Sequence, residues 1–213
     1  RDSLTILVAT FGGLVIESWG TQTNLWHYYT AERPPLWIIP AWPIATLTIN
    51  RIVRLLNLLL KNAKKSNLIN NKTASSQEHA PRRVIFQVFT LKTAYWILFT
   101  AFFLLMLTFV SPTFNKSYTL LATLLVILLI ITPTDCKLAI LTFIAGVGLG
   151  YFLELWGTTR ECWTYYTFQK PPLFAVLAHG MAAVAFWRTE LLFKIIWQKI
   201  VSIPRKSLER EGL

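Results

Sequence analysis

The sequence is poor in the residues that build disulfide frameworks and metal centres. Its 213 residues include two cysteines and three histidines. Cys136 and Cys162 fall in loops that we predict on opposite sides of a membrane, so they are not expected to pair. The histidines lack the clustered spacing of a zinc site, and there is no P-loop or nucleophile elbow. We therefore expect no metal, no cofactor and no disulfide scaffold.

Acidic residues are also scarce. Ten Asp and Glu stand against 21 Lys and Arg, for a net charge of +11. In a soluble protein this excess would suggest nucleic acid as a partner. Here the basic residues cluster at the ends of apolar runs, which is typical of membrane topology and of attraction to anionic lipid. We expect membrane lipid as a partner and no nucleic acid.

Long polar stretches are nearly absent, because 54% of the residues are hydrophobic. Spanning a bilayer takes roughly 20 mostly apolar residues, and a helix satisfies its own backbone hydrogen bonds in lipid. The sequence therefore predicts an all-α fold, a polytopic membrane bundle of about six transmembrane helices. The predicted helices cover about 4–19, 35–60, 84–110, 118–132, 137–156 and 172–197.

The one long polar stretch is 61–83, whose Asn, Lys and Ser content predicts a flexible linker. It divides the chain into a first half, 1–60, and a second half, 84–213. Its positive charge and that of the C-terminal tail predict that both lie in the cytoplasm. We expect an integral membrane protein, of the bacterial inner membrane.

A tandem repeat organises the sequence: residues 13–51 and 150–188 align without a gap at an offset of 137. Fifteen of 39 positions are identical. The shared residues of the first copy are Gly13, Glu17, Trp19, Gly20, Thr21, Trp26, Tyr28, Tyr29, Thr30, Pro34, Pro35, Leu36, Ala41, Ala45 and Arg51. Each copy thus contains G-x-x-x-E-x-W-G-T, W-x-Y-Y-T and P-P-L.

An even number of predicted crossings separates the copies. The repeats are therefore expected to be parallel, related by a pseudo-twofold axis along the membrane normal, unlike the inverted repeats of many transporters. Both aromatic loops, 19–35 and 156–172, should face the extracytoplasmic side. Two predicted helices precede the second copy and none precedes the first, so we expect two N-terminal helices to be missing from this sequence.

Glu17 and Glu154 are the first candidates for catalysis. A carboxylate near hydrocarbon is costly, by about 2 to 3 kcal/mol at the bilayer centre, so such residues are functional candidates. Each lies four residues after a glycine, where a ligand or another helix can approach closely. One interpretation is a general acid. The alternative is a structural glutamate bonded to Thr21, to Thr158 or to a tyrosine hydroxyl.

The aromatic residues of the two loops are candidates for substrate binding. Aromatic faces stabilise a cation by roughly 0.5 to 2 kcal/mol each, which suits a carbocation formed by protonating an alkene. The alternative is an aromatic belt at the membrane interface. The candidates are Trp19, Trp26, Tyr28, Tyr29, Trp156, Trp163, Tyr165 and Tyr166.

One difference between the copies and one shared arginine complete the set of candidates. Trp42 of the first copy becomes His179 in the second, so His179 and Glu154 are predicted to form an acid–base pair, or His179 simply packs. Arg51 and Arg188 are equivalent and lie near the cytoplasmic helix ends. They are candidates to bind an anionic lipid head group, with snorkelling to lipid phosphates as the alternative.

The E-x-W-G-T and W-x-Y-Y motifs with the following prolines resemble those of the integral-membrane carotenoid hydratases, and of related lycopene cyclases and small membrane terpene cyclases. The resemblance covers the two repeats. It implies a small multi-helix enzyme whose acidic residues protonate isoprenoid double bonds. Three hypotheses follow: an enzyme acting on an isoprenoid or other lipid, a non-catalytic subunit that docks other membrane subunits through the extracytoplasmic loops, and a lipid carrier or transporter. Both carboxylates opening into one apolar cavity would favour the enzyme.

Overall fold

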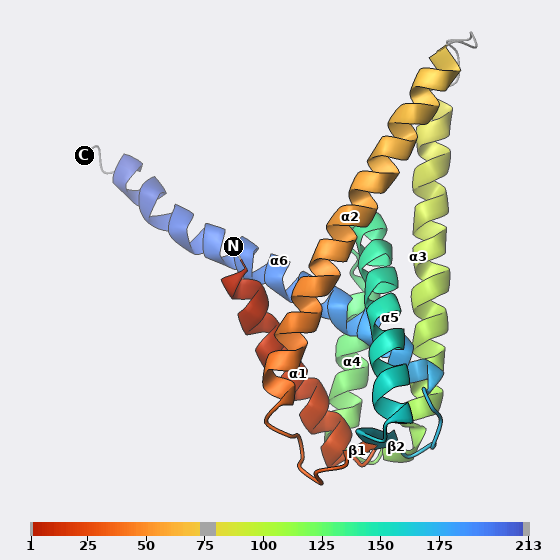
Figure 1. Ribbon diagram of the computed structural model, residues 1–213. Coiled ribbons are helices and arrows are strands. Elements are labelled where there is room, and N and C mark those ends of the chain that lie inside the picture. The colour runs from red at the N-terminus through yellow and green to blue at the C-terminus, as the bar shows by residue number, and fades with distance from the viewer. Residues whose placement is uncertain (1, 73–79, 211–213) are drawn as a thin grey trace.

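The chain folds as a bundle of α-helices with almost no sheet, which confirms the predicted all-α class. The computed structural model describes the backbone of residues 2–72 and 80–210, and the side chains of residues 2–63 and 90–201. Its elements, shown in Figure 1, are α1 (Ser3–Gln22), β1 (Trp26–Tyr28), α2 (Ile38–Lys72), α3 (Ala80–Val110), a 3-10 turn η1 (Ser111–Thr113), α4 (Ser117–Ile131), α5 (Cys136–Thr159), β2 (Trp163–Tyr165) and α6 (Leu173–Arg210).

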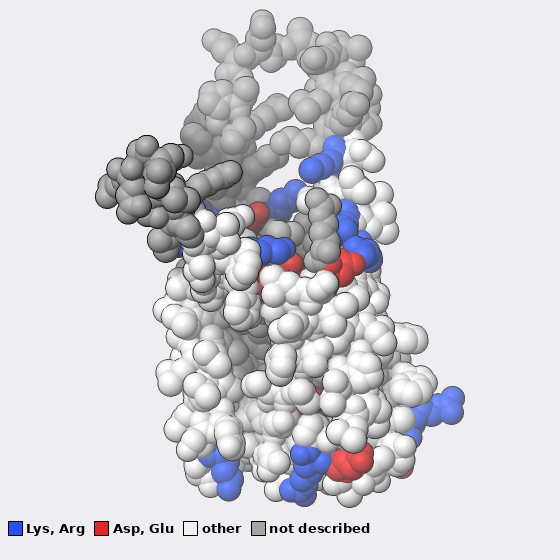
Figure 2. Space-filling view, turned by 90° about the vertical axis from the view of Figure 1, so that its left-hand side faces the viewer, with Lys and Arg blue, Asp and Glu red and all other residues white. Residues whose placement is uncertain are grey.

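Within the described residues, four helices are long and apolar enough to cross a membrane: Ser3–Gln22, Ile38–Ala63, Thr90–Thr113 and Cys136–Thr159. Figure 2 shows a face on which the charged side chains gather toward the two ends and leave a largely uncharged band between them. Hydrocarbon requires a band of this kind, because unpaired charge is costly there. The fold is that of a helical membrane protein.

The fourth and sixth predicted crossings differ from these four helices. The α4 helix is apolar but has 15 residues. The α6 helix is long, and it runs obliquely across the bundle in Figure 1. Its hydropathy is lowered by His179, Arg188 and Glu190, so it is not among the four candidate spans. A total of six crossings stays a prediction.

The helices around the predicted linker are longer than the sequence indicated. The α2 helix continues past residue 60 to Lys72, and α3 begins at Ala80 rather than at Val84. Adding a residue to an existing helix end costs far less than nucleating a helix, which explains this extension through a polar sequence. Of the predicted linker 61–83, residues 73–79 lie outside the described residues. The α2 helix begins at Ile38 because the residues after Pro35 form a turn.

The two copies of the repeat have the same fold. The first unit comprises α1, β1 and α2, and the second comprises α5, β2 and α6. Left-handed backbone conformations recur at the same offset, at Asn24 (φ 61°) and Glu161 (φ 59°). In each unit the first helix packs against the second, and across the units α2 packs on α5 and α1 on α6.

The two aromatic loops pair with each other across a pseudo-twofold axis. Strands β1 and β2 are antiparallel, and the central residue His27 lies opposite its own copy, Thr164. Beyond the strands, the Tyr29 amide donates to the Cys162 carbonyl at 3.1 Å, and the equivalent amide of the second unit donates to the carbonyl of Leu25 at 3.1 Å. Both loops therefore lie at one end of the bundle (Figure 1), as predicted for parallel repeats.

Among the described residues, helix α3 packs against the second unit. The Phe109 ring stacks on Phe174 of α6, with centroids 4.3 Å apart, and the Phe109 carbonyl accepts a hydrogen bond from Tyr166 at 2.7 Å. Phe174 is 6% exposed as a result. Its copy in the first unit, Trp37, is 42% exposed, and Tyr29, the copy of Tyr166, is 74% exposed. No described segment covers this face of the first unit.

Candidate functional site

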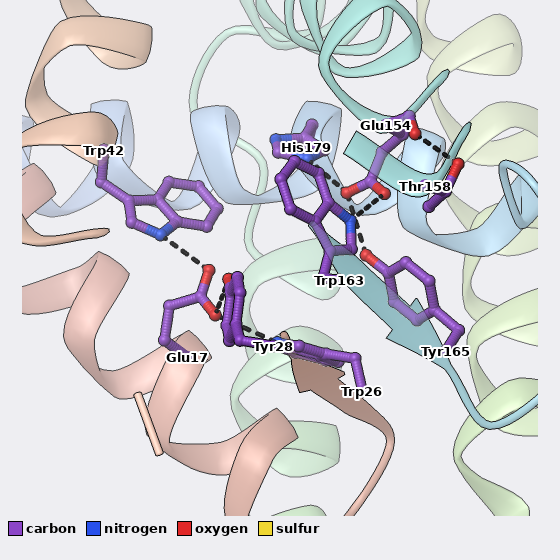
Figure 3. Close-up of polar contacts among 9 residues, drawn as sticks. All are labelled: Glu17, Trp26, Tyr28, Trp42, Glu154, Thr158, Trp163, Tyr165 and His179. Atoms are coloured by element: carbon purple, nitrogen blue, oxygen red, sulfur yellow. Dashed lines mark hydrogen bonds and ion pairs between the residues drawn. The ribbon is translucent and has the colours of Figure 1, made fainter. Parts of the chain in front are cut away.

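Three aromatic donors surround the buried carboxylate of Glu17, which is 5% exposed in α1 (Figure 3). The indole N–H of Trp26 and the hydroxyl of Tyr28 donate to Oε2, at 3.0 and 2.7 Å. The indole N–H of Trp42, on α2, donates to Oε1 at 3.1 Å. Glu17 thus joins α1, its own loop and the next helix.

Glu154 has the same arrangement in the second unit, with one replacement. The indole N–H of Trp163 donates to Oε2 at 2.9 Å, and the hydroxyl of Tyr165 donates to Oε1 at 2.9 Å. The third partner is Nε2 of His179, 3.0 Å from Oε1. The predicted pairing of His179 with Glu154 is therefore present in the structure, and Figure 3 shows the two sites facing each other.

The motif glycines leave space for the rings that reach the glutamates. A Cβ on Gly13 would lie 2.3 Å from the Trp42 ring, and a Cβ on Gly150 would lie 2.5 Å from His179. A Cβ on Gly20 would lie 1.9 Å from the Trp26 ring. The open patch beside each glutamate, which the sequence predicted, is thus filled by a side chain of the neighbouring helix.

The tyrosine partners are held as hydrogen-bond donors. Burial raises the pKa of the Tyr28 hydroxyl, and the neighbouring Glu17 carboxylate raises it further. Burial likewise raises the pKa of the Tyr165 hydroxyl well above its usual range, with Glu154 adding to the effect. Both phenols therefore keep their protons. An indole N–H can only donate, so these partners suit a carboxylate, which only accepts.

The glutamates make some of the hydrogen bonds that a purely structural role predicted. The hydroxyls of Thr21 and Thr158 donate to the backbone carbonyls of Glu17 and Glu154, at 2.7 and 2.6 Å. They do not reach the carboxylates. The tyrosine hydroxyls do, so each glutamate braces its loop, which was the alternative to catalysis.

His179 is what distinguishes the second site chemically. Its ring stacks on that of Trp42, its copy in the first unit, with centroids 5.5 Å apart and planes at 23°. The His179 side chain is 18% exposed, whereas the Glu154 side chain is 5% exposed. Imidazole can donate, accept or carry a proton, and indole can only donate. The second site can therefore take up and release a proton in a way that the first cannot.

Both sites border one apolar cavity of about 1360 Å³. Its walls come mainly from α1, α4 and α6, and some of the apolar residues that line it have exposed side chains, among them Val15, Leu125 and Leu192. Glu17, Glu154 and His179 all line it. A cavity with few polar groups that opens beside apolar helix faces suits a lipid-soluble ligand.

The predicted aromatic residues have three different environments. Trp26, Tyr28, Trp163 and Tyr165 bond to the glutamates and line the cavity. Trp19 and Trp156 also line it, and Trp19 donates to the Thr119 hydroxyl of α4 at 3.1 Å. Tyr29 and Tyr166 do not line it.

The two equivalent arginines also differ. Arg188 lines the cavity and donates to the carbonyl of Leu129 at 3.2 Å and to the hydroxyl of Thr132 at 3.1 Å. Arg51 does not line the cavity, and it forms an ion pair with Asp2 at 2.8 Å. The equivalence in sequence therefore does not extend to their surroundings.

Sequence reasoning missed Trp42 as a partner of Glu17 and α4 as a wall of the cavity. The signal for Trp42 was available, since it is the copy of His179, which the sequence paired with Glu154. Helix α4 is apolar nearly all round and has no copy in the first half, so nothing in its pattern indicated which face borders a cavity. Among the described residues, no group of three or more His, Cys, Asp or Glu could hold a metal ion.

In comparisons with known proteins, no family model, no curated protein and no solved structure matches this chain. The site must therefore be interpreted from its own chemistry.

Proposed function

We propose that the protein is an integral membrane enzyme that acts on an isoprenoid lipid by acid–base chemistry. One observation carries the proposal: Glu17, Glu154 and His179 line a single apolar cavity of about 1360 Å³. An apolar cavity with a few converging polar groups is the usual form of a small-molecule site. The resemblance to carotenoid hydratases and to lycopene and terpene cyclases agrees with this class of substrate.

The protonation chemistry is assigned to the second site. His179 is the more exposed member of the pair and borders the cavity, so it transfers the proton to or from the substrate. Glu154 accepts from the imidazole at 3.0 Å, which orients the ring and stabilises its protonated form. Protonation of a C=C bond by the imidazolium makes a carbocation. That cation takes up water, loses a proton, or is attacked by another double bond, and the proton released returns to the imidazole.

The first site lacks a titratable group in the place of His179, because Trp42 stands there. Its role in the proposal is electrostatic. The Glu17 carboxylate and the indole rings beside the cavity stabilise the positive charge that develops on the substrate. The protein lies in the bacterial inner membrane in this proposal, with both aromatic loops extracytoplasmic and the linker and C terminus cytoplasmic, as the charge distribution predicts.

Solvent deuterium tests the reaction class even while the individual substrate is unidentified. The purified protein in liposomes is incubated in D₂O with an apolar lipid extract of the producing cells, and the lipids are analysed by mass spectrometry. Protonation of a C=C bond leaves deuterium on carbon. We expect the label in an isoprenoid lipid with the wild-type protein and its loss in His179→Gln and Glu154→Gln.

His179→Trp is the sharpest variant, since it gives the second site the composition of the first, which folds. It should bind the lipid and leave it unlabelled. Glu161→Gln is the control, because Glu161 is exposed and pairs with Lys170 away from the cavity. Labelling by His179→Trp at the wild-type rate, or no labelled isoprenoid with any protein, would refute the proposal. Bound lipid that the wild type leaves unlabelled would instead identify a carrier.

A second candidate function, a docking subunit of a larger membrane complex, is favoured by the uncovered face of the first unit. Trp37 is 42% exposed, whereas Phe174, the copy of Trp37, is 6% exposed beneath α3. This candidate predicts a partner helix that shields Trp37 and co-purifies in equal amount. A protein that labels lipid as a pure single chain would exclude it as the main function.

A further inference from the structure

The cavity has a second polar end, away from the glutamates. His179 and Arg188 both line it and both lie on α6, nine residues apart (188 − 179). At 1.5 Å per residue they are separated by roughly 13 Å along the helix axis. Thr134 and Thr189 line the cavity together with Arg188. The acid–base pair and the cation therefore border the same apolar cavity.

Arg188 has a charge that no described carboxylate pairs with. Its guanidinium carries five N–H donors, and the two described hydrogen bonds go to neutral groups, the carbonyl of Leu129 and the hydroxyl of Thr132. Arg51, at the equivalent position, is neutralised by Asp2 at 2.8 Å. The repeat thus provides an internal comparison in which only the arginine that borders the cavity lacks an acidic partner among the described residues.

An unpaired cation at the edge of an apolar cavity selects for an anion. Leaving it without a counter-charge near hydrocarbon is costly, and a guanidinium binds phosphate oxygens through two parallel N–H donors. The bond to Leu129 also has a structural use, because it satisfies a carbonyl at the end of α4. That use takes up one N–H donor and leaves the guanidinium charge without a carboxylate partner among the described residues.

We propose that the cavity binds an isoprenoid with a phosphate or diphosphate head group, held by Arg188, with its apolar chain directed toward His179. The proposal narrows the substrate class and rests on the proposed function for the claim that this lipid is the substrate. The head group lies at the membrane interface opposite the aromatic loops. Near its start, α4 contacts Trp19 beside the loops through Thr119, and Arg188 contacts its other end at Leu129.

Two probes with the same chain test the selectivity: geranylgeranyl monophosphate and geranylgeraniol. The full-length protein in a neutral detergent is titrated with each, and binding is followed by tryptophan fluorescence, since several tryptophans line the cavity. Hydrogen bonds to a charged group predict at least about tenfold tighter binding of the phosphate. Arg188→Gln should remove that preference, Arg188→Lys should keep part of it, and Arg51→Gln should leave it unchanged.

Three results would overturn the proposal. They are equal binding of the two probes by the wild type, an undiminished preference in Arg188→Gln, and full competition by millimolar inorganic phosphate, which would mean that a free anion and not a lipid head group occupies the site. The wild-type comparison is decisive even if Arg188→Gln does not fold. Deuterium labelling without a head-group preference would refute this inference and leave the proposed function supported. A head-group preference without labelling would support this inference and refute the proposed function.

Discussion

Replacing each glutamate by glutamine should affect the two sites unequally, although the sites are equivalent in sequence. The amide of Gln has one acceptor oxygen and one donor group. At position 17 the amide NH₂ faces the indole N–H of Trp42 in one orientation and that of Trp26 in the other. Because an indole N–H cannot accept, one of the two is left unpaired whichever way the amide turns.

At position 154 the same substitution leaves no indole N–H unpaired, and the group that loses its acceptor is the Tyr165 hydroxyl, which can turn about its C–O bond. The amide oxygen replaces Oε2 and accepts from Trp163. The NH₂ replaces Oε1, where the hydroxyl oxygen of Tyr165 and Nε2 of His179 can both accept. The imidazole needs only to carry its proton on Nδ1 instead. His179 thus makes the second site tolerant of an exchange that the first site cannot accommodate.

The expected difference follows from the one unpaired N–H. Loss of charge on the acceptor weakens the remaining hydrogen bonds in both variants, so it cancels in the comparison. An unsatisfied buried donor costs about 1 to 3 kcal/mol. For a chain of this length, 1 kcal/mol corresponds to about 2 to 4 °C. Glu17→Gln should therefore unfold below Glu154→Gln, by up to about 12 °C.

Thermal unfolding in detergent, followed by intrinsic tryptophan fluorescence, measures this difference. Glu161→Gln serves as the control, since its carboxylate is exposed and its loss should leave the Tm at the wild-type value. If Glu154→Gln unfolds at the same temperature as Glu17→Gln or below it, then His179 does not act as an acceptor, and the assignment of proton transfer to this residue loses its basis.

Two further predictions concern packing and pH. Gly20→Ala should destabilise the protein by about 1 to 3 kcal/mol, because the new Cβ would lie 1.9 Å from an indole ring. Gly148→Ala, with no atom within 4 Å of its new Cβ, should instead stabilise the protein by about 0.5 to 1 kcal/mol. A Tm that falls, or rises, in both variants would contradict this pair of predictions. The free energy of unfolding should fall as pH rises above about 10, because burial raises the phenol pKa of Tyr28 and Tyr165 in the folded state only, so the unfolded chain ionises first. Tyr28→Phe with Tyr165→Phe should flatten this alkaline loss, and an unchanged pH profile would contradict the assignment.

Much of the architecture could be predicted from the sequence, since it depends on local pattern. Runs of apolar residues of sufficient length identified the helices, and a gapless alignment over 39 positions identified two copies of one fold. The strands were missed because Trp26 to Tyr28 is three residues long, too short for its alternation to stand out from an aromatic loop. The extension of α2 to Lys72 was missed because the polar composition of this stretch indicates only that it is not buried. A helix can still extend through such a stretch by local backbone hydrogen bonds.

By itself, the sequence determined the duplication, the helical membrane class and the presence of the same acidic and aromatic residues in each copy. These follow from spacing along one chain. Only the tertiary structure decided that the two copies face each other across one cavity, that α4 forms part of its wall, and that Arg188 borders it while Arg51 pairs with Asp2. The physical reason is that two identical motifs have different neighbours once α3 and α4 pack against one side. Contacts between distant segments, which spacing does not encode, then give equivalent residues different chemistry.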